Sequence, residues 1–221
     1  MRFWYKELAV RHFRFSLSRC RMKKEQLPDI TGIILVGGKS RRMGRDKAFL
    51  TWDGAPLFEK VLRIFRENFA TVLLVGGDFE RYGRYGERII PDLHPGSALG
   101  GLYTGLYHAT IDYIFVASCD MPYPSSALLK YLCSLKDGYD CVVPETAQAL
   151  EPLFAVYAKS ALPAMLDLLD SGNFRIYDLY PRLRTRYVGV TELAPFAQCG
   201  RSFVNVNTPE DFALLGKEPM S

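Results

Sequence analysis

The sequence predicts an α/β fold in which a mostly parallel β-sheet is covered by helices on both faces. From residue 30 onward, short apolar segments rich in β-branched residues alternate with longer amphipathic segments. Strands of a parallel sheet are buried on both faces and form continuous apolar runs, whereas the helices between them keep a polar side. The chain has 221 residues, of which 48% are hydrophobic, and this suits one domain with a full core.

The predicted strands are short and almost free of polar side chains. Their length and their β-branched composition are typical of strands inside a sheet. They are "GIILV" (32–36), "TVLLV" (71–75), "RII" (88–90), "YIFVAS" (113–118) and "DCVVP" (140–144).

The predicted helices separate these strands. In residues 56–69, Leu57, Val61 and Phe65 recur at helical spacing on one side, and charged residues occupy the other. Further helices are expected at 99–110, at 125–135 and at 160–172, where Gly172 ends the last one. The sequence contains neither a repeat nor a low-complexity linker, so we expect a single domain over residues 22–221.

The positive charge of the chain is concentrated at its N-terminus. The formal net charge is +4, and residues 1–21 hold six cations and one acidic residue, a local +5. The remaining residues therefore carry about −1 (4 − 5), which argues against a general nucleic-acid-binding groove. No apolar run approaches the roughly 18–20 residues of a bilayer span, so we expect neither a nucleic-acid nor a membrane partner.

Residues 1–21 have two interpretations. The segment is Arg-rich and acid-poor, as transit peptides are, and it lacks the apolar run of a secretory signal. Alternatively, translation begins at Met22 and the segment is an over-long gene prediction. We treat it as a basic N-terminal extension outside the fold.

The five cysteines and three histidines show no metal-binding spacing. The cysteines form no C-x-x-C pair and their number is odd. This pattern is typical of reduced intracellular thiols, and it predicts a cytoplasmic protein without disulfides. We expect His94 and His108 to be ordinary loop or surface residues.

The segment "GGKSRRMGRDK" (37–47) directly follows the first strand and combines glycines with five cations. Glycines allow main-chain N–H groups to surround an anion, and Arg and Lys side chains add positive charge. This favours a phosphate-binding loop over the alternative, a basic surface turn. Because Lys47 is followed by Ala48, the loop is not a G-x-x-x-x-G-K-[ST] motif, and its glycines are not spaced as G-x-G-x-x-G.

Other polar segments also directly follow predicted strands. They are "GGD" (76–78), "PD" (91–92) and "CDMP" (119–122). In open parallel sheets, ligands bind beyond the carboxyl ends of the strands, where the strand order reverses. We therefore expect these segments and the glycine-rich loop to line one site.

The segment "LVGGKSRRMGRDKAFL" (35–50) strongly resembles the L-x-G-G-x-S-x-R-M-G-x-D-K signature of the molybdenum cofactor guanylyltransferases. The resemblance covers nearly everything from residue 30 to 215 and implies a Rossmann-like three-layer fold of the nucleotidyltransferase type. It continues in order through "PD" (91–92), "LGG" (99–101), "CDMP" (119–122), "EPLFAVY" (151–157) and "FVNVNTPED" (203–211).

The chain departs from the family pattern at three places. Val36 replaces the usual Ala of the first loop, and Gly76 stands where relatives carry an Asn. The segment 97–101 lacks the usual Pro. This loss puts in doubt how rigidly the loop frames the nucleotide, but not the type of reaction.

The resemblance implies that the protein transfers GMP from GTP to molybdenum-loaded molybdopterin. The products would be the molybdopterin guanine dinucleotide cofactor and pyrophosphate, and the implied metal is Mg²⁺. The implied protein partners make transient contacts, either delivering the molybdenum cofactor or accepting it.

By the same resemblance, Lys47 and Asp120 are the catalytic residues. Asp120 would hold Mg²⁺, because a carboxylate at the end of an apolar central strand is costly without a partner; the alternative is a helix cap or turn residue. Lys47 would contact the α- and β-phosphates, and its alternative is a surface ion pair with Asp46. Asp92 would lie on the nucleotide side, and its alternative is a plain turn residue.

The resemblance also implies a wider set of contacts. Asn205 and Asn207 would face one side of a strand in "FVNVN", and Thr208–Asp211 would begin a helix. The implied GTP-binding residues are Leu35, Val36, Gly37, Gly38, Ser40, Arg42, Met43, Gly44, Lys47, Gly76, Asp92 and Asp120. The implied contacts of the molybdopterin substrate are Glu151, Arg175, Asn205 and Asn207.

Three other functions remain open from the sequence. Molybdenum cofactor cytidylyltransferases share the fold but favour L-A-A-G in the first loop, so Gly37 favours guanine. Sugar-phosphate and other small-substrate nucleotidyltransferases match the last motif less well. A nucleotide-binding module in cofactor delivery, without turnover, would need neither Lys47 nor Asp120, and both are present.

Overall fold

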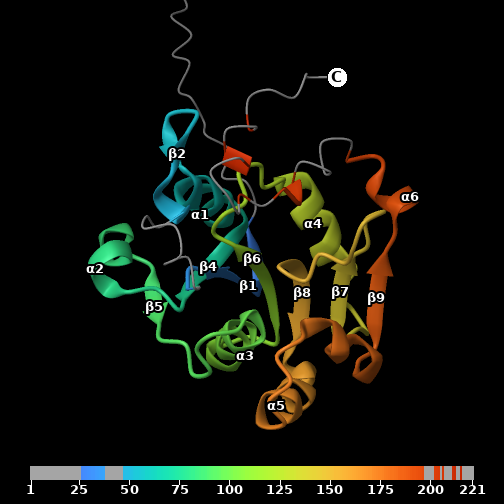
Figure 1. Ribbon diagram of the computed structural model, residues 1–221. Helices are drawn as coiled ribbons and strands as arrows, with labels where there is room; N and C mark the ends of the chain where they lie inside the picture. Colours follow the sequence, from blue (N-terminus) through green and yellow to red (C-terminus); the bar gives the residue numbers. More distant parts are fainter. Residues whose placement is uncertain are drawn as a thin grey trace, which may run out of the picture.

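The computed structural model describes residues 26–37, 47–196, 202–204, 206, 211, 212 and 215. Its main element is a seven-stranded sheet with the strand order β5-β4-β1-β6-β8-β7-β9, flanked by helices (Figure 1). The predicted α/β fold, with a mostly parallel sheet covered on both faces, is confirmed.

Six strands of the sheet form its parallel part, and β8 runs antiparallel to both of its neighbours, β6 and β7. Strand β1 lies between β4 and β6 and is parallel to both. The strands are β1 (Leu27–Leu35), β4 (Phe69–Val75), β5 (Arg88–Ile90), β6 (Tyr113–Ser118), β7 (Cys141–Pro144), β8 (Phe154–Ala158) and β9 (Thr185–Val188).

All four predicted helices are present, and their ends lie within two residues of the prediction. They are α1 (Leu57–Asn68), α3 (Ala98–His108), α4 (Ser126–Ser134) and α5 (Leu162–Asp170). The shorter elements are η2 (Lys47–Phe49), the hairpin of β2 (Thr51–Trp52) and β3 (Ala55–Pro56), α2 (Phe79–Tyr82), η3 (Gly83–Tyr85), η4 (Lys159–Ala161), η5 (Ile176–Arg182) and α6 (Val190–Leu193). None of these helices has the length and hydrophobicity of a transmembrane segment.

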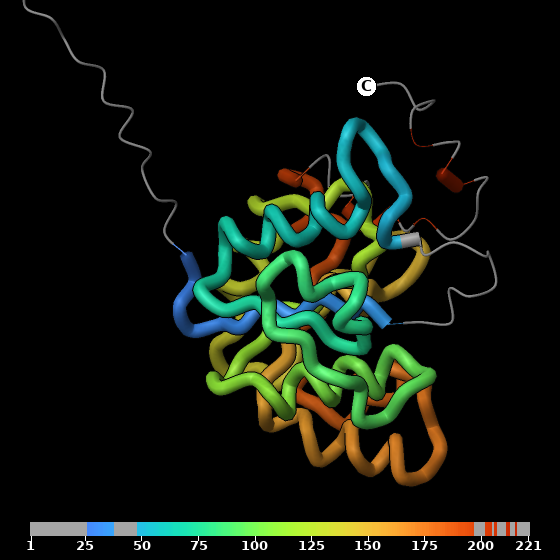
Figure 2. Tube along the Cα trace, turned by 90° about the vertical axis from the view of Figure 1, so that its left-hand side faces the viewer, coloured from blue at the N-terminus to red at the C-terminus, as the bar shows by residue number. Residues whose placement is uncertain are grey.

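The helices form two layers that enclose the sheet. Helices α1 and α4 cover one face, and α3 and α5 cover the other (Figures 1 and 2). Consecutive residues of a strand point to opposite faces of the sheet. Ile34 therefore belongs to the same buried cluster as Phe65 of α1, whereas Ile33 belongs to the cluster on the other face, together with Leu106 of α3. The apolar runs of the sequence thus fill two cores, one on each side of the sheet.

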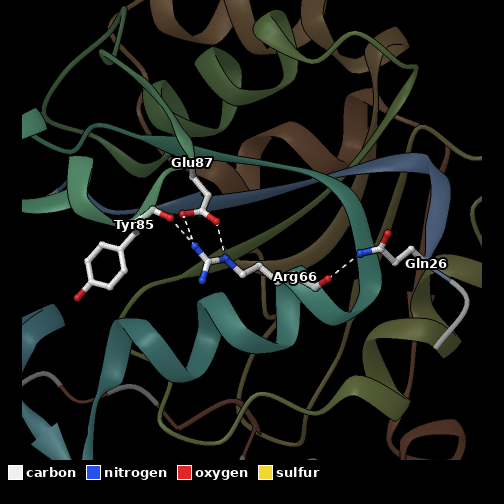
Figure 3. A network of polar contacts seen from close by, with 4 residues as sticks. All are labelled: Gln26, Arg66, Tyr85 and Glu87. Atoms are coloured by element: carbon white, nitrogen blue, oxygen red, sulfur yellow. Dashed lines mark hydrogen bonds and ion pairs between the residues drawn. The ribbon is translucent and has the colours of Figure 1, made fainter. Parts of the chain in front are cut away.

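A polar network fixes the amino ends of β1 and β5 to helix α1 (Figure 3). The Nε of Arg66 donates to Oε1 of Glu87 at 2.6 Å, and its Nη2 donates to Oε2 of the same carboxylate at 2.9 Å. The side chain of Gln26 donates to the carbonyl oxygen of Arg66 at 2.7 Å. A two-pronged pairing of Arg with a carboxylate holds its partners in one orientation, so this network makes a rigid frame at the end of the strands opposite to the predicted site.

Candidate active site

The carboxyl ends of β1 and β6 meet where the strand order reverses. Leu35, the last residue of β1, pairs with Val75 of β4 on one side and with Ser118 of β6 on the other. The main-chain N–H of Cys119 donates to the carbonyl oxygen of Leu35 at 3.2 Å, so the pairing continues past the end of β6. The segments that follow these strands are therefore neighbours, as the sequence predicted.

The glycines at the ends of β1 and β4 are in direct main-chain contact. A Cβ atom on Gly37 would lie 2.8 Å from the carbonyl oxygen of Gly76, closer than real Cβ contacts. Gly76 also has a φ of +83°, in the left-handed region that side chains disfavour. Its N–H donates to the carbonyl oxygen of Ile90 at 3.0 Å, which extends the contact to the end of β5. Glycine at both positions allows three strand ends to converge.

Most of the predicted phosphate-binding loop lies outside the described residues. This applies to Gly38, Ser40, Arg42, Met43 and Gly44. The described chain reaches Gly37 at the end of β1 and resumes at Lys47, the first residue of η2. The roles of these residues stay predictions.

Asp92 follows β5 and is held by hydrogen bonds to one carboxylate oxygen. Its Oδ1 accepts from the main-chain N–H of His94 and from the hydroxyl of Thr104, both at 3.0 Å. The first bond is a local turn bond, so the turn role foreseen as an alternative is present. The other oxygen, Oδ2, lies 3.8 Å from the Cβ position of Gly101 in α3. Asp92 therefore stabilises the turn through Oδ1, while Oδ2 of the half-buried side chain remains as an acceptor at the site.

The loop before α3 is held without the proline of the family pattern. The hydroxyl of Ser97 caps the helix by accepting from the N–H of Gly100 at 2.9 Å. A Cβ atom on Gly100 would lie only 2.0 Å from the carbonyl oxygen of His94. This close packing of main chain on main chain holds the loop against the start of α3 without a proline. His94 itself packs edge-on against the ring of Tyr103, with centroids 5.2 Å apart.

Asp120 lies in the turn after β6 and is not a helix cap. Helix α4 is capped by Ser125, whose hydroxyl accepts from the N–H of Leu128 at 3.3 Å. The Oδ1 of Asp120 accepts from the hydroxyl of Ser118, and its carbonyl oxygen accepts from the N–H of Val206 at 3.2 Å. No ion pair to Asp120 is found among the described residues. Its half-buried carboxylate is thus oriented by Ser118 but carries no compensating charge in the part of the chain described.

The prediction of a strand in "FVNVN" is wrong for the described residues. Phe203 lies in a turn, and Val204 and Val206 belong to no strand. Phe203 and Val206 are buried whereas Val204 is 36% exposed, so the burial does not follow the alternation of a strand. Asn205 and Asn207 lie outside the described residues. Packing of Phe203 against Phe154 of β8, with ring centroids 5.8 Å apart, attaches this segment to the sheet.

Glu151 lies at the same edge of the sheet as Asp120. Ala117 of β6 pairs with Phe154 of β8, and the N–H of Ser118 donates to the carbonyl oxygen of Leu153 at 3.3 Å. Because the two strands are antiparallel, the residues before β8 face those after β6. Burial of the Glu151 side chain raises the pKa of its carboxyl to about 7.

Arg175 is exposed and lies directly before η5. Its main-chain N–H donates to Oδ1 of Asn173 at 3.1 Å. The hydroxyl of Tyr177 in η5 donates to the carbonyl oxygen of Leu150, the residue before Glu151, at 3.1 Å. Segment 173–180 is therefore fixed next to Glu151, on the β8 side of Asp120.

The donors at this edge fit a hard cation that is shared with phosphates. Among the described residues, no group of three or more His, Cys, Asp or Glu side chains is gathered in one place. Asp120 supplies a single carboxylate instead. Mg²⁺ is usually bound by one or two carboxylates together with water and substrate phosphates, so the donor set fits this ion.

Two residues of this edge escaped the sequence analysis. Ser118 orients Asp120, and Thr104 orients Asp92 and also accepts from the N–H of Leu93 at 3.0 Å. Ser118 is two residues before Asp120 at a strand end, so the spacing S-x-D was a usable signal. Thr104 gives no such signal, because it reaches Asp92 from the following helix.

The fold and this edge define a protein of the nucleotidyltransferase class. A model of the MobA-like NTP transferase domain matches residues 32–185, which is more than half of the chain. The chain belongs to this family.

Similar proteins agree with this assignment. A probable molybdenum cofactor guanylyltransferase from Pelotomaculum thermopropionicum is 39% identical over 182 residues, which cover 82% of this chain and 89% of the relative. A molybdenum cofactor guanylyltransferase from Vibrio vulnificus is 30% identical over 198 residues, which cover 86% of this chain and 97% of the relative. The crystal structure of molybdopterin-guanine dinucleotide biosynthesis protein A from Archaeoglobus fulgidus is similar with a TM-score of 0.73 and 30% identity, covering 86% of this chain and all of that one.

Proposed function

We propose that this protein transfers GMP from GTP to the terminal phosphate of molybdenum-loaded molybdopterin. A phosphate oxygen of the acceptor attacks the α-phosphorus of GTP, the bond from that phosphorus to the bridging oxygen of the β-phosphate breaks, and pyrophosphate leaves. The products are the molybdopterin guanine dinucleotide cofactor and pyrophosphate. The observation that supports this most directly is the convergence of Gly37, Gly76, Asp92 and Asp120 at one strand-order reversal, in a family whose similar members are named guanylyltransferases.

The nucleotide is assigned to the β1–β4–β5 side of the edge. Main-chain N–H groups of the loop after β1, with Ser40 and Arg42, would bind the phosphates, and Lys47 would neutralise charge on the α- and β-phosphates. Asp92, with Oδ1 held by Thr104, would contact the nucleotide through Oδ2. These roles require positioning and charge neutralisation, which supply most of the rate enhancement in phosphoryl transfer.

The metal and the acceptor are assigned to the β6–β8 side. Asp120 would hold Mg²⁺, which supplies positive charge to the phosphates when it is bound. Glu151, Arg175, Asn205 and Asn207 would contact the molybdopterin substrate. We further propose that residues 22–221 form one nucleotidyltransferase domain, that the protein is cytoplasmic, and that it makes transient contacts with proteins that deliver or accept the cofactor.

One experiment tests the proposed reaction. The purified protein is incubated with Mg²⁺, molybdenum-loaded molybdopterin and one of the four nucleoside triphosphates, and the product is identified by mass spectrometry. We expect the guanine dinucleotide and pyrophosphate from GTP, and neither when the acceptor is omitted. A cytosine dinucleotide formed from CTP in preference to GTP, or no dinucleotide from any triphosphate, would contradict the proposal.

A further inference from the structure

A small apolar cluster lies apart from the two cores on the faces of the sheet and joins three segments of the chain. We call it the satellite cluster. Its buried members are Leu57, Val206 and Leu215, and the half-buried side chains packed against them are Leu50, Trp52, Tyr123 and Phe212. None of these residues has been assigned to the transfer reaction. Each of the three segments, 47–57, 120–123 and 203–215, nevertheless carries a residue that has been.

Trp52 belongs to the β2–β3 hairpin, which closely follows η2. Both turn residues of the hairpin, 53 and 54, have a positive φ, at +49° and +78°. Two-residue turns of this kind match the twist of the strands that they join, so they make a tight hairpin. The main-chain N–H of Leu57 donates to the carbonyl oxygen of Leu50 at 3.0 Å and closes the base of the hairpin. The hairpin is therefore a firm extension of η2, whose first residue is Lys47.

The indole of Trp52 attaches the hairpin to the C-terminal segment. It packs edge-on against the ring of Phe212, with centroids 6.1 Å apart and an angle of 81° between the ring planes, which is a favourable geometry for an aromatic pair. In the same cluster, the main-chain N–H of Val206 donates to the carbonyl oxygen of Asp120 at 3.2 Å. A continuous set of contacts thus runs from η2 through Trp52 and Phe212 to Asp120.

The satellite cluster is much smaller than the two cores on the faces of the sheet. Regions with few buried apolar contacts open locally at a lower free energy than the core does. A change within the satellite cluster can therefore loosen the contact between the hairpin and the C-terminal segment while the sheet stays folded. An effect on the site can then be separated from an effect on global stability.

We propose that Trp52 is a positioning residue for the transfer reaction. By packing on Phe212 it holds the C-terminal segment against Asp120 and keeps η2, which begins at Lys47, in a fixed place relative to that carboxylate. The inference rests on the proposed function, which assigns Lys47 to the phosphates and Asp120 to Mg²⁺. In-line attack on the α-phosphorus requires the groups on both sides to be aligned, and a misplacement of about 1 Å can lower the rate about a hundredfold. Trp52 acts through the satellite cluster and contacts no reacting atom.

Steady-state kinetics of the full chain with Mg²⁺, GTP and molybdenum-loaded molybdopterin test this role. Trp52→Ala should lower kcat by at least about tenfold and change the KM for GTP by less than about threefold, because alignment matters most in the transition state. Trp52→Phe keeps a ring on Phe212 and should restore most of kcat. Phe212→Ala should lower kcat as Trp52→Ala does, and the double variant should lose little more, since both changes remove one contact. Tyr139→Ala, which removes a ring that is 37% exposed just before β7, is the control and should change neither constant.

Amide hydrogen exchange, followed by NMR on the ¹⁵N-labelled full chain without metal, GTP or acceptor, tests the link between Trp52 and Asp120 independently of turnover. In Trp52→Ala the amide of Val206 should exchange at least about tenfold faster, whereas the amides of the central strand β6 should exchange as before. An unmodified chain that forms no dinucleotide contradicts the proposed function, whereas unchanged exchange at Val206 contradicts the link itself. A kcat of Trp52→Ala within about twofold of the unmodified chain, or a loss of kcat that Trp52→Phe does not recover, would likewise overturn the positioning role.

Discussion

The main-chain N–H of Val206 donates a hydrogen bond of 3.2 Å to the carbonyl oxygen of Asp120. Val206 is fully buried in a small cluster with Leu57 and Leu215, so the bond is shielded from water. Val206 of the motif "FVNVNTPED" and Asp120 of "CDMP", which are far apart in the sequence, are therefore adjacent in the fold. The main chain of Asp120 is fixed by this bond, and its carboxylate is left to interact with ligands.

Replacement of Asp120 by Asn should remove activity without unfolding the protein. The amide is neutral and therefore a much weaker Mg²⁺ ligand than a carboxylate, so we expect Mg²⁺-dependent pyrophosphate release to fall by at least about a hundredfold. The bond from Val206 uses the main chain and survives, so the melting temperature should change little. Asp112→Asn, at the exposed amino end of β6, is the matched control. Substantial turnover by Asp120→Asn would remove this carboxylate from the mechanism.

Replacement of Gly37 by Ala should lower both stability and nucleotide binding. The new methyl group would lie 2.8 Å from the carbonyl oxygen of Gly76, so the ends of β1 and β4 must separate. Forced packing of this kind typically costs about 1–3 kcal/mol, which urea denaturation would measure.

Gly189→Ala is the control for the Gly37 variant. The added Cβ of Gly189 meets nothing within 4 Å, and its φ of −80° suits any residue. We expect its effect to stay within about 0.5 kcal/mol. An equal loss of stability in the two variants would show that the contact between Gly37 and Gly76 has no special cost.

Much of the fold was predictable because its signals are local. The strand at 113–118 was placed correctly from its apolar run, and the helix predicted at 125–135 matches α4 to within one residue at each end. The antiparallel direction of β8 could not be predicted, since a fully buried strand has the same apolar pattern in either direction. The prediction of a strand in "FVNVN" was wrong for a related reason. Val206 is buried by contacts with distant residues, which the alternation of polar and apolar residues does not encode.

The candidate site was predictable only in part. Strand ends in a parallel sheet share one edge, so Asp92 and Asp120 could be placed there from their positions alone. Thr104 could not, because its bond to Asp92 depends on how α3 packs against the end of β5.

Replacement of Asp140 by Asn should destabilise the fold in a pH-dependent way. Hydrogen bonds from the guanidinium of Arg184, whose Nη2 lies 3.1 Å from Oδ1, and from the hydroxyl of Ser160 lower the pKa of the Asp140 carboxyl to about 2. A lowered pKa contributes stability above the pKa of the unfolded chain, near 3.8, which is lost as the pH falls through the folded value near 2. We expect a deficit of roughly 2 kcal/mol at neutral pH that shrinks toward about pH 2.

Urea denaturation over a pH series would measure this deficit. Asp137→Asn is the control, because the side chain of Asp137 is 85% exposed and its ion pair with Lys136 contributes little. A deficit of the Asp140 variant that is independent of pH would show that shape, not charge, accounts for the loss.

Replacement of Glu151 by Gln should stabilise the protein at alkaline pH. Burial raises the pKa of this carboxyl from 4.5 in the unfolded chain to about 7, so the folded state binds more protons than the unfolded state between these values. Its contribution to stability is fully present below about pH 4.5 and is lost as the pH rises through about 7. Gln cannot ionise, so the variant should escape this loss, and the two proteins should diverge in urea denaturation between about pH 5 and 8. Glu145→Gln, an exposed position at the end of the preceding strand, should show no such divergence. The opposite result would be a difference in the free energy of unfolding between Glu151→Gln and the unmodified chain that stays constant over this range. It would mean that the Glu151 carboxyl is already ionised in the folded protein near pH 5, so that burial at the edge of β8 does not hold it neutral.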